Sequence, residues 1–219
     1  MGLAIDVISD VICPWCYIGK RRLEKAVAAL GGPVMVRWLA FQLNPTMPKE
    51  GVSRREYRTK KFGSWERSQE LDARVVAAGE AEGIHFAFDR IGRTPNTLDA
   101  HRLVGLAERQ GVQGAVVEAL FRAYFTEGRD ISHRQTLLDV VAEAGLDRDE
   151  AEAVLNSDGG REAVKEADTL ARQFRVEGVP FFIIDGTFTL SGAQQPDAFL
   201  AVFSQAIGSK EQADSSTPF

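Results

Sequence analysis

The sequence predicts an α/β fold that is interrupted by a large all-helical insertion. Strand-like runs lie near both ends of the chain, at residues 3–9 and 181–184, whereas the periodicity of residues 44–158 is mostly helical. The only two cysteines, Cys13 and Cys16, stand where the first strand-like run gives way to a helix-like run. Without the insertion, the order of strands and helices predicts a four-stranded mixed sheet with helices on both faces.

The N-terminal part predicts a strand–helix–strand unit. Residues 3–9 form a strand rich in β-branched side chains. Residues 14–30 form a helix, because Pro14 suits a first helical turn and apolar side chains recur every three or four residues up to a Gly-Gly-Pro stop. Residues 34–41 form a second strand that is partly apolar on both faces. A unit of this size implies parallel strands joined by a right-handed crossover.

The middle of the chain predicts helices and loops but no confident strand. A loop at 44–48 precedes helices at 65–83, 94–111, 112–126, 133–144 and 147–155. Ser132 stands where an N-cap is expected, and the alternation of residues 85–88 predicts a short extended piece.

The C-terminal part returns to mixed structure. It predicts a helix at 161–174, a hairpin of strands 181–184 and 187–190 around Asp185-Gly186, and a last helix at 197–207. We therefore assign residues 1–43 and 159–207 to one discontinuous domain, 44–158 to a helical insertion domain and 208–219 to a flexible tail.

Composition excludes several classes of protein. The chain has 219 residues and a net charge of −5 without a basic tract, so we expect no nucleic-acid partner. No stretch approaches the roughly 18 apolar residues of a membrane span. The first residues enter the first strand directly, without the charged and apolar regions of a secretory signal. These features predict a cytoplasmic protein without a membrane partner; a periplasmic protein whose signal has been removed is the alternative, because its mature sequence would look similar.

The spacing of Cys13 and Cys16 predicts a dithiol redox site. A helix N-terminus carries unpaired N–H groups and a partial positive charge, which favour a thiolate over a thiol. Cys13 is nearer the helix start, so we expect it to be the nucleophile and the more exposed of the two thiols, and we expect Cys16 to resolve the mixed disulfide. Pro14 and Trp15 tune the pair through local N–H geometry and packing.

A metal site is the alternative for the two cysteines. Zinc usually takes four ligands, and the three histidines, His85, His101 and His133, are scattered along the chain. We therefore expect no metal and no cofactor other than the redox-active pair itself.

Several stretches carry a resemblance to a known family. They are residues 10–19 with their Cys-Pro-Trp-Cys motif, residues 95–103, and residues 178–183 with 191–194. In these stretches the chain resembles the FrnE-type oxidoreductases of the DsbA family, which are related to 2-hydroxychromene-2-carboxylate isomerases. The resemblance covers roughly residues 3–207 and implies a thioredoxin fold with a large all-helical insertion, as in DsbA.

The resemblance also implies where a substrate binds. It implies that Pro180 is cis and lies beside the cysteine pair, with the backbone of Val179 open to an extended peptide. Asn96 and His101 are candidates to line the cleft, and Trp65, Phe62 and Phe86 are candidates for a hydrophobic client groove, although core packing is the plainer use of most of these rings.

One expected group is missing. Related folds often carry an acid about six positions before the first cysteine, where it accepts the proton of the buried thiol, but this chain has Val7 there. Asp6 is one step away, which on a strand means the opposite face. Asp10 is a nearer candidate, although a turn or strand-end cap is its plainer role.

Three functions follow from these observations. The first is a thiol–disulfide oxidoreductase, that is, an oxidase, reductase or isomerase of protein dithiols. Its partners would be protein or small-molecule thiols and disulfides, with glutathione as an optional co-substrate. The second is a glutathione-dependent isomerase or transferase of a small aromatic substrate, which the intact cysteine pair disfavours. The third is a non-catalytic client-binding chaperone module. A monomer and a homodimer both fit the sequence.

Overall fold

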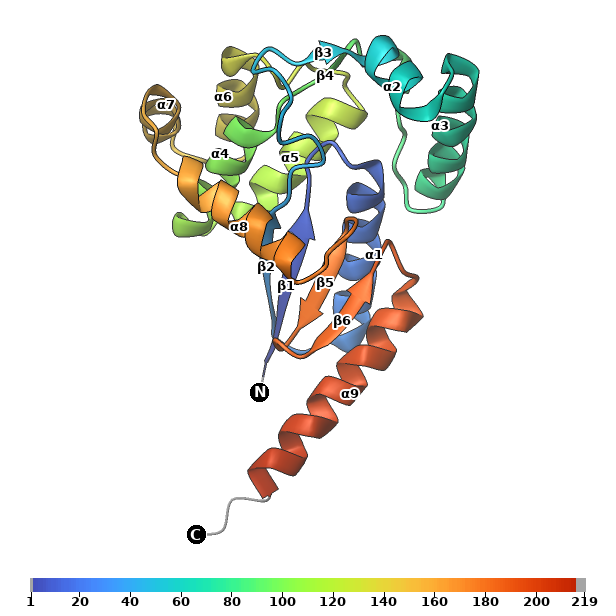
Figure 1. Ribbon diagram of the computed structural model, residues 1–219. Coiled ribbons are helices and arrows are strands. Elements are labelled where there is room, and N and C mark those ends of the chain that lie inside the picture. Colours follow the sequence, from blue (N-terminus) through green and yellow to red (C-terminus); the bar gives the residue numbers. More distant parts are fainter. Residues whose placement is uncertain (1, 216–219) are drawn as a thin grey trace.

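The computed structural model describes residues 2–215. Its centre is a four-stranded sheet in the order β2-β1-β5-β6 (Figure 1). The strand β1 (Leu3–Ser9) pairs in parallel with β2 (Val34–Ala40) and antiparallel with β5 (Phe181–Ile184), and β5 pairs antiparallel with β6 (Phe188–Ser191). The predicted mixed sheet is therefore confirmed.

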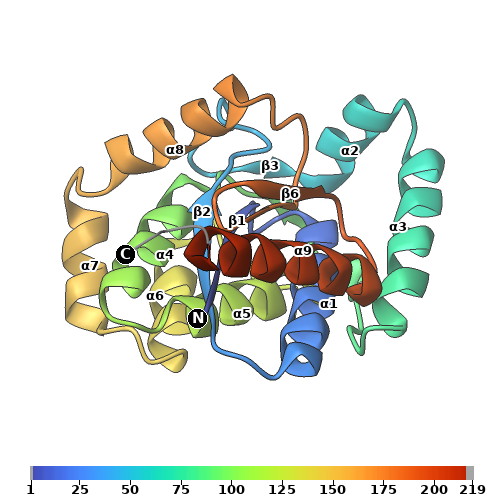
Figure 2. The same cartoon turned by 90° about the horizontal axis from the view of Figure 1, so that it is seen from below.

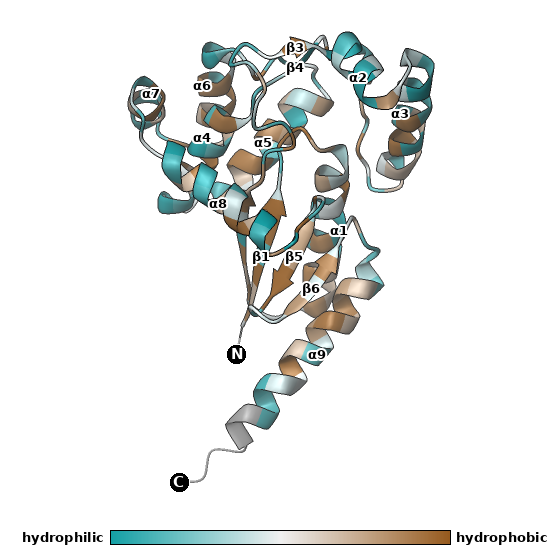
Figure 3. Cartoon of the chain, in the orientation of Figure 1, coloured by the Kyte–Doolittle hydropathy of each residue, from teal (hydrophilic) through white to brown (hydrophobic). Residues whose placement is uncertain are grey.

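Helices cover both faces of this sheet. On one face lie α1 (Pro14–Leu30) and α9 (Pro196–Ser215), and on the other lies α8 (Arg161–Gln173) (Figure 2). The alternation of β1 divides its side chains between the two faces: Val7 belongs to the main core, whereas Ile8 packs in a smaller cluster with Ala171 of α8. Figure 3 shows how hydrophobic residues concentrate in the strands between these helices.

The helical insertion lies between β2 and α8, above the carboxyl ends of β1 and β2 (Figure 1). It contains α2 (Arg54–Phe62), α3 (Trp65–Glu80), α4 (Leu98–Arg109), α5 (Gln113–Phe125), α6 (Arg134–Glu143) and α7 (Arg148–Asn156). The helix α5 packs on β2, where the Gln113 side-chain amide donates to the Trp38 carbonyl oxygen and accepts from the Trp38 N–H. The insertion and the sheet therefore share one hydrophobic core.

The structure corrects the prediction for residues 49–64 and 91–94. Helix α2 was not predicted, and two very short strands, β3 (Val52–Ser53) and β4 (Arg93–Thr94), form an antiparallel pair where no strand was expected. A strand of two residues carries no alternation that a sequence pattern would reveal.

Two further details of the insertion were wrong. Residues 85–87 belong to no strand, and Phe88 lies in a 3₁₀ turn, η1 (Phe88–Arg90). The Ala87 N–H donates to the Phe125 carbonyl oxygen of α5 rather than to a neighbouring strand. Ser132 does not cap α6: its hydroxyl bonds to Asp130 Oδ1 instead, and His133 is the N-cap residue.

The last helix is longer than predicted. We expected α9 to end at Ile207 and a flexible tail to start at residue 208, but the helix continues to Ser215. Lys210 holds this extension against the sheet, because its Nζ lies 2.8 Å from Asp185 Oδ2 and donates to the Gly2 carbonyl oxygen. Residues 216–219 of the expected tail lie outside the described part of the chain. None of the helices within residues 2–215 is long and apolar enough to cross a membrane.

Candidate active site

The two cysteines lie at the start of α1, directly after the inner strand β1. Cys13 is the N-cap residue of α1, Pro14 occupies the first helical position, and the Cys16 N–H donates to the Cys13 carbonyl oxygen at 3.0 Å. Both are free thiols. The first turn of α1 contains no acidic residue, so no negative side chain in that turn opposes a thiolate at the positive end of the helix.

Access differs between the two thiols. Cys13 is 5% exposed and Cys16 is completely buried, so the thiol nearer the helix start is the more accessible one. Burial raises the pKa of Cys16 well above its ordinary value, and the neighbouring Cys13 raises it further. The Ser9 side chain and the Asp10 backbone hydrogen-bond to Cys16 and act in the opposite direction. Cys16 is therefore protonated at neutral pH.

The loop before β5 lies against Cys13. The Val179–Pro180 peptide bond is cis, as the resemblance implied, and the Cys13 thiol donates to the Val179 carbonyl oxygen at 3.4 Å. Gly19 of α1 permits this approach, because a Cβ atom at that position would lie 2.9 Å from Pro180 Cγ. Val179 is half-buried, and its carbonyl group faces the reactive sulfur.

The structure confirms that no carboxylate faces the pair from β1. Val7 is fully buried, and Asp6 lies on the other face, where it forms an ion pair with Arg37 at 2.8 Å. Asp10 caps the chain after β2 instead, because its Oδ2 accepts from the Leu43 N–H at 2.8 Å.

Neither polar candidate of the insertion lines a cleft at Cys13. His101 is buried on α4, where its Nε2 lies 3.3 Å from Asp10 Oδ1. Asn96 holds the start of α4: its amide donates to the Met47 carbonyl oxygen and accepts from the Leu98 N–H. Within the described residues, no cluster of histidine, cysteine and acidic side chains is arranged to hold a metal ion.

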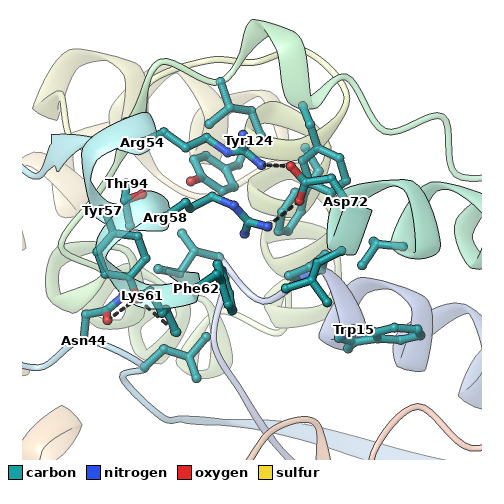
Figure 4. Close-up of a pocket in the computed structure, with 18 of the residues that line it drawn as sticks. Trp15, Asn44, Arg54, Tyr57, Arg58, Lys61, Phe62, Asp72, Thr94 and Tyr124 are labelled. Atoms are coloured by element: carbon teal, nitrogen blue, oxygen red, sulfur yellow. Dashed lines mark hydrogen bonds and ion pairs between the residues drawn. The ribbon is translucent and has the colours of Figure 1, made fainter. Parts of the chain in front are cut away.

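A cavity of about 450 Å³ opens beside the cysteine motif. Pro14 and Trp15 of α1 line it together with residues of α2 and α3. Figure 4 shows Trp15 at one end of the cavity and Tyr57 and Lys61 of α2 at the other. Arg54 and Arg58 of α2 both bind Asp72 of α3, with nitrogen–oxygen distances of 2.6 Å (Figure 4). Burial lowers the pKa of Arg58, with a further contribution from the charge of Arg54, and Asp72 opposes this shift.

The hydrophobic candidates divide between two places. Phe62 lines this cavity, whereas Trp65 and Phe86 line a neighbouring hollow on the other side of Arg54. Phe86 also packs in the core, with its ring stacked on Phe88 at 5.0 Å.

The sequence pattern did not indicate the polar residues with which α2 lines the cavity. These are Tyr57, Arg58 and Lys61, together with Arg54 at the start of the helix. A signal was present, because Ser53-x-x-Glu56 has the pattern of a capping box, and the Ser53 hydroxyl accepts from the Glu56 N–H.

The fold and the cysteine pair together define a dithiol protein of the thioredoxin type. The model of the DSBA-like thioredoxin domain family matches residues 4–204. The chain therefore belongs to the DsbA-like family of thiol–disulfide oxidoreductases.

Three known proteins are similar to this chain. The structure of a probable DsbA oxidoreductase, SCO1869 from Streptomyces coelicolor, is 33% identical, with a TM-score of 0.85 over 99% of this chain and 92% of the other. The uncharacterised protein YwbO of Bacillus subtilis is 27% identical over 97% of this chain and 99% of its own length. The cytosolic disulfide reductase DsbM from Pseudomonas aeruginosa, at 24% identity, has a TM-score of 0.68 over 93% and 98% of the chains and shares the fold.

Proposed function

We propose that this protein exchanges disulfides with protein dithiols, with Cys13 as the attacking thiol and Cys16 as the resolving thiol. The observation that carries the proposal is the unequal setting of the two thiols: Cys13 lies at the helix start against Val179, and Cys16 is buried and protonated one turn further on.

The two cysteines carry out both bond exchanges of the reaction. In the reduced protein, the Cys13 thiolate attacks a substrate disulfide, a mixed disulfide forms, and one substrate thiolate leaves. Cys16 then loses its proton and attacks Cys13, so that the Cys13–Cys16 disulfide forms and the second substrate thiolate leaves. The same steps in reverse oxidise a substrate dithiol.

The open backbone beside Cys13 suits an extended substrate. The Val179 carbonyl group lies at the cysteine pair, and a peptide that runs past it would pair its own N–H groups with this loop. Small thiols are further substrates, and glutathione is one candidate, since the related disulfide reductase DsbM has a structure with GSH. The cytosolic setting of that relative also supports a cytoplasmic location for this protein.

Trapping tests the proposal. The variant Cys16→Ala should accumulate mixed disulfides on Cys13 when mixed with a protein that contains a disulfide, and reducing agent should release them. Cys13→Ser should abolish reduction of the same protein. Activity that survives Cys13→Ser would contradict the proposal, and isomerisation of an aromatic substrate that needs glutathione but not Cys16 would favour the isomerase class instead.

A further inference from the structure

The cavity beside the cysteine motif is strongly cationic. Four cationic side chains line it, Arg54, Arg58, Lys61 and Arg74, against one carboxylate, Asp72, so its lining carries a net formal charge of +3. The whole chain has a net charge of −5. The positive charge of this cavity is therefore a local feature, opposite in sign to the rest of the molecule.

Two of these cations have no carboxylate partner. Lys61 Nζ donates to the Tyr57 hydroxyl at 2.9 Å and lies over the rings of Tyr57 and Phe62. The Arg74 side chain, on α3, forms neither a hydrogen bond nor an ion pair with another group in the described part of the chain. Asp72 already binds two guanidinium groups, Arg54 and Arg58, so the structure leaves positive charge that an incoming anion would neutralise.

The rest of the lining is mainly apolar. Trp15, 40% exposed, stands on the side of the cysteine motif, and Leu43, Phe62 and Val75 add apolar surface. A volume of about 450 Å³ lies in the range of small-molecule sites. The chemistry that fits is a small molecule with anionic groups on an apolar body.

On the basis of the proposed disulfide exchange, we propose that this cavity binds the carboxylate-bearing part of a small anionic disulfide, or of the thiol formed from that disulfide. The cavity would thereby present a sulfur atom of the bound molecule to Cys13. Ile12, Pro14 and Trp15 line the cavity, and Ile12 and Pro14 are the two neighbours of Cys13 in the chain, so the cavity borders the start of α1. Lys61 and Arg74 bind the carboxylates, and Trp15 and Phe62 pack against the apolar part.

The step is an ordinary two-electron exchange. The Cys13 thiolate attacks one sulfur of the small disulfide, the sulfur–sulfur bond of that molecule breaks, and one carboxylated thiolate leaves and takes a proton from water. Cys16 gives up its proton and displaces the second thiolate from Cys13, so the Cys13–Cys16 disulfide forms and the second thiolate takes up a proton. The protein gains a disulfide, and the small disulfide is reduced to two thiols.

A matched pair of disulfides tests the inference. The probes are 3,3′-dithiodipropionate, a dianion, and its uncharged diamide, each mixed with the fully reduced protein at low ionic strength. Each rate is divided by the rate of the same disulfide with free dithiothreitol, which removes the difference in intrinsic reactivity. We expect the normalised rate of the dianion to exceed that of the diamide about tenfold, because a cavity of opposite charge concentrates the ligand, and the preference should fall in high salt.

Variants locate the origin of the preference. Lys61→Gln and Arg74→Gln should each reduce the ratio of the two normalised rates about two- to fivefold, as expected for an exposed ion pair. Lys60→Gln is the matched control, since it removes the same charge from an exposed position of the same helix, α2, but outside the cavity lining.

The outcomes separate this inference from the proposed function. If Cys13 reacts with neither disulfide, disulfide exchange itself fails. If both react but the dianion has no advantage, or if Lys60→Gln reduces the ratio as much as Lys61→Gln does, the inference is overturned while the exchange activity stands.

Discussion

The sulfur of Cys13 lies 3.4 Å from the carbonyl oxygen of Val179, a residue 166 positions further along the chain. The contact joins the start of α1 to the loop before β5, and Gly19 and Pro180 bring the two segments together. Cys16 lies on the buried side of the same helical turn. The contact therefore gives the two thiols of one short motif different surroundings.

This difference predicts selective alkylation. Iodoacetamide at about pH 7 should modify Cys13 of the reduced, folded protein before Cys16, because only a reachable thiolate reacts and Cys16 is both buried and protonated. Peptide mass spectrometry after digestion gives the modified fraction of each thiol. Both should react in denaturant, and equal rates in the folded protein would contradict the assignment of the attacking thiol.

Removal of the Ser9 hydroxyl should slow the resolving step. Burial raises the pKa of Cys16 and the Ser9 hydrogen bond lowers it, so Ser9→Ala should raise it further. Only the thiolate attacks. Because less thiolate is then present at a given pH, the pH profile of the resolving step should move to higher pH.

The rate at which a mixed disulfide on Cys13 disappears, followed over a range of pH, measures this effect. Ser204→Ala is a suitable control, since that hydroxyl is exposed on α9 and bonds only to the Leu200 carbonyl oxygen. A profile that does not move in Ser9→Ala would remove Ser9 from the mechanism.

Gly19→Ala should disturb the contact between α1 and the loop before β5. The added methyl group would lie 2.9 Å from Pro180 Cγ and 3.2 Å from Phe182 Cζ, so the loop or the helix has to move. We expect the free energy of unfolding to fall by about 1–2 kcal/mol, as for other overpacked sites, and the exchange rate to fall with it.

Gly105→Ala is the matched control for this prediction. Gly105 lies within α4, and a Cβ atom there would meet nothing within 4 Å. Alanine should raise the free energy of unfolding by up to about 1 kcal/mol, the difference in helix propensity. Urea denaturation measures both variants, and a neutral Gly19→Ala would show that the contact is loose.

Glu118 of α5 should contribute stability that depends on pH. Burial raises its pKa, but hydrogen bonds and charge from Lys20, Tyr17 and Arg21 outweigh burial, so its pKa lies below the ordinary value. A lowered pKa in the folded state gives stability that is present above the unfolded value of about 4.3 and is lost as the pH falls through the folded value.

Glu118→Gln should therefore lower the free energy of unfolding by about 1–2 kcal/mol at neutral pH, because Lys20 and Arg21 then keep only Glu24 as a carboxylate partner. The difference from the unmodified protein should shrink as the pH falls below about 4. Denaturation at several pH values measures it. Glu143→Gln, which breaks only the exposed pair with Arg129, should change stability much less.

The sequence predicted the sheet and the cysteine site because their signals are local. The β-branched run of β1, Pro14 at the start of α1 and the Asp185-Gly186 turn each determine the conformation of a few adjacent residues. Family resemblance supplied the cis form of Pro180, which no local pattern indicates.

The cavity was not predictable in the same way. Its charge comes from α2 and α3, and α2 has few apolar residues, so its helical pattern is weak in the sequence. What fixes α2 is the pairing of Arg54 and Arg58 with Asp72, residues separated by 18 and 14 positions. The continuation of α9 beyond Ile207 likewise depends on Lys210 reaching Asp185.

The first turn of α1 faces two surfaces. Cys13 touches the loop at Val179, whereas Trp15 lines the cavity built largely by α2 and α3. In the proposed site, substitutions in those two helices would alter which molecules the cavity binds without changing either sulfur or the proline loop. The ligand preference of the cavity can therefore change while the cysteine pair stays the same, although residues of both sites lie in one helical turn.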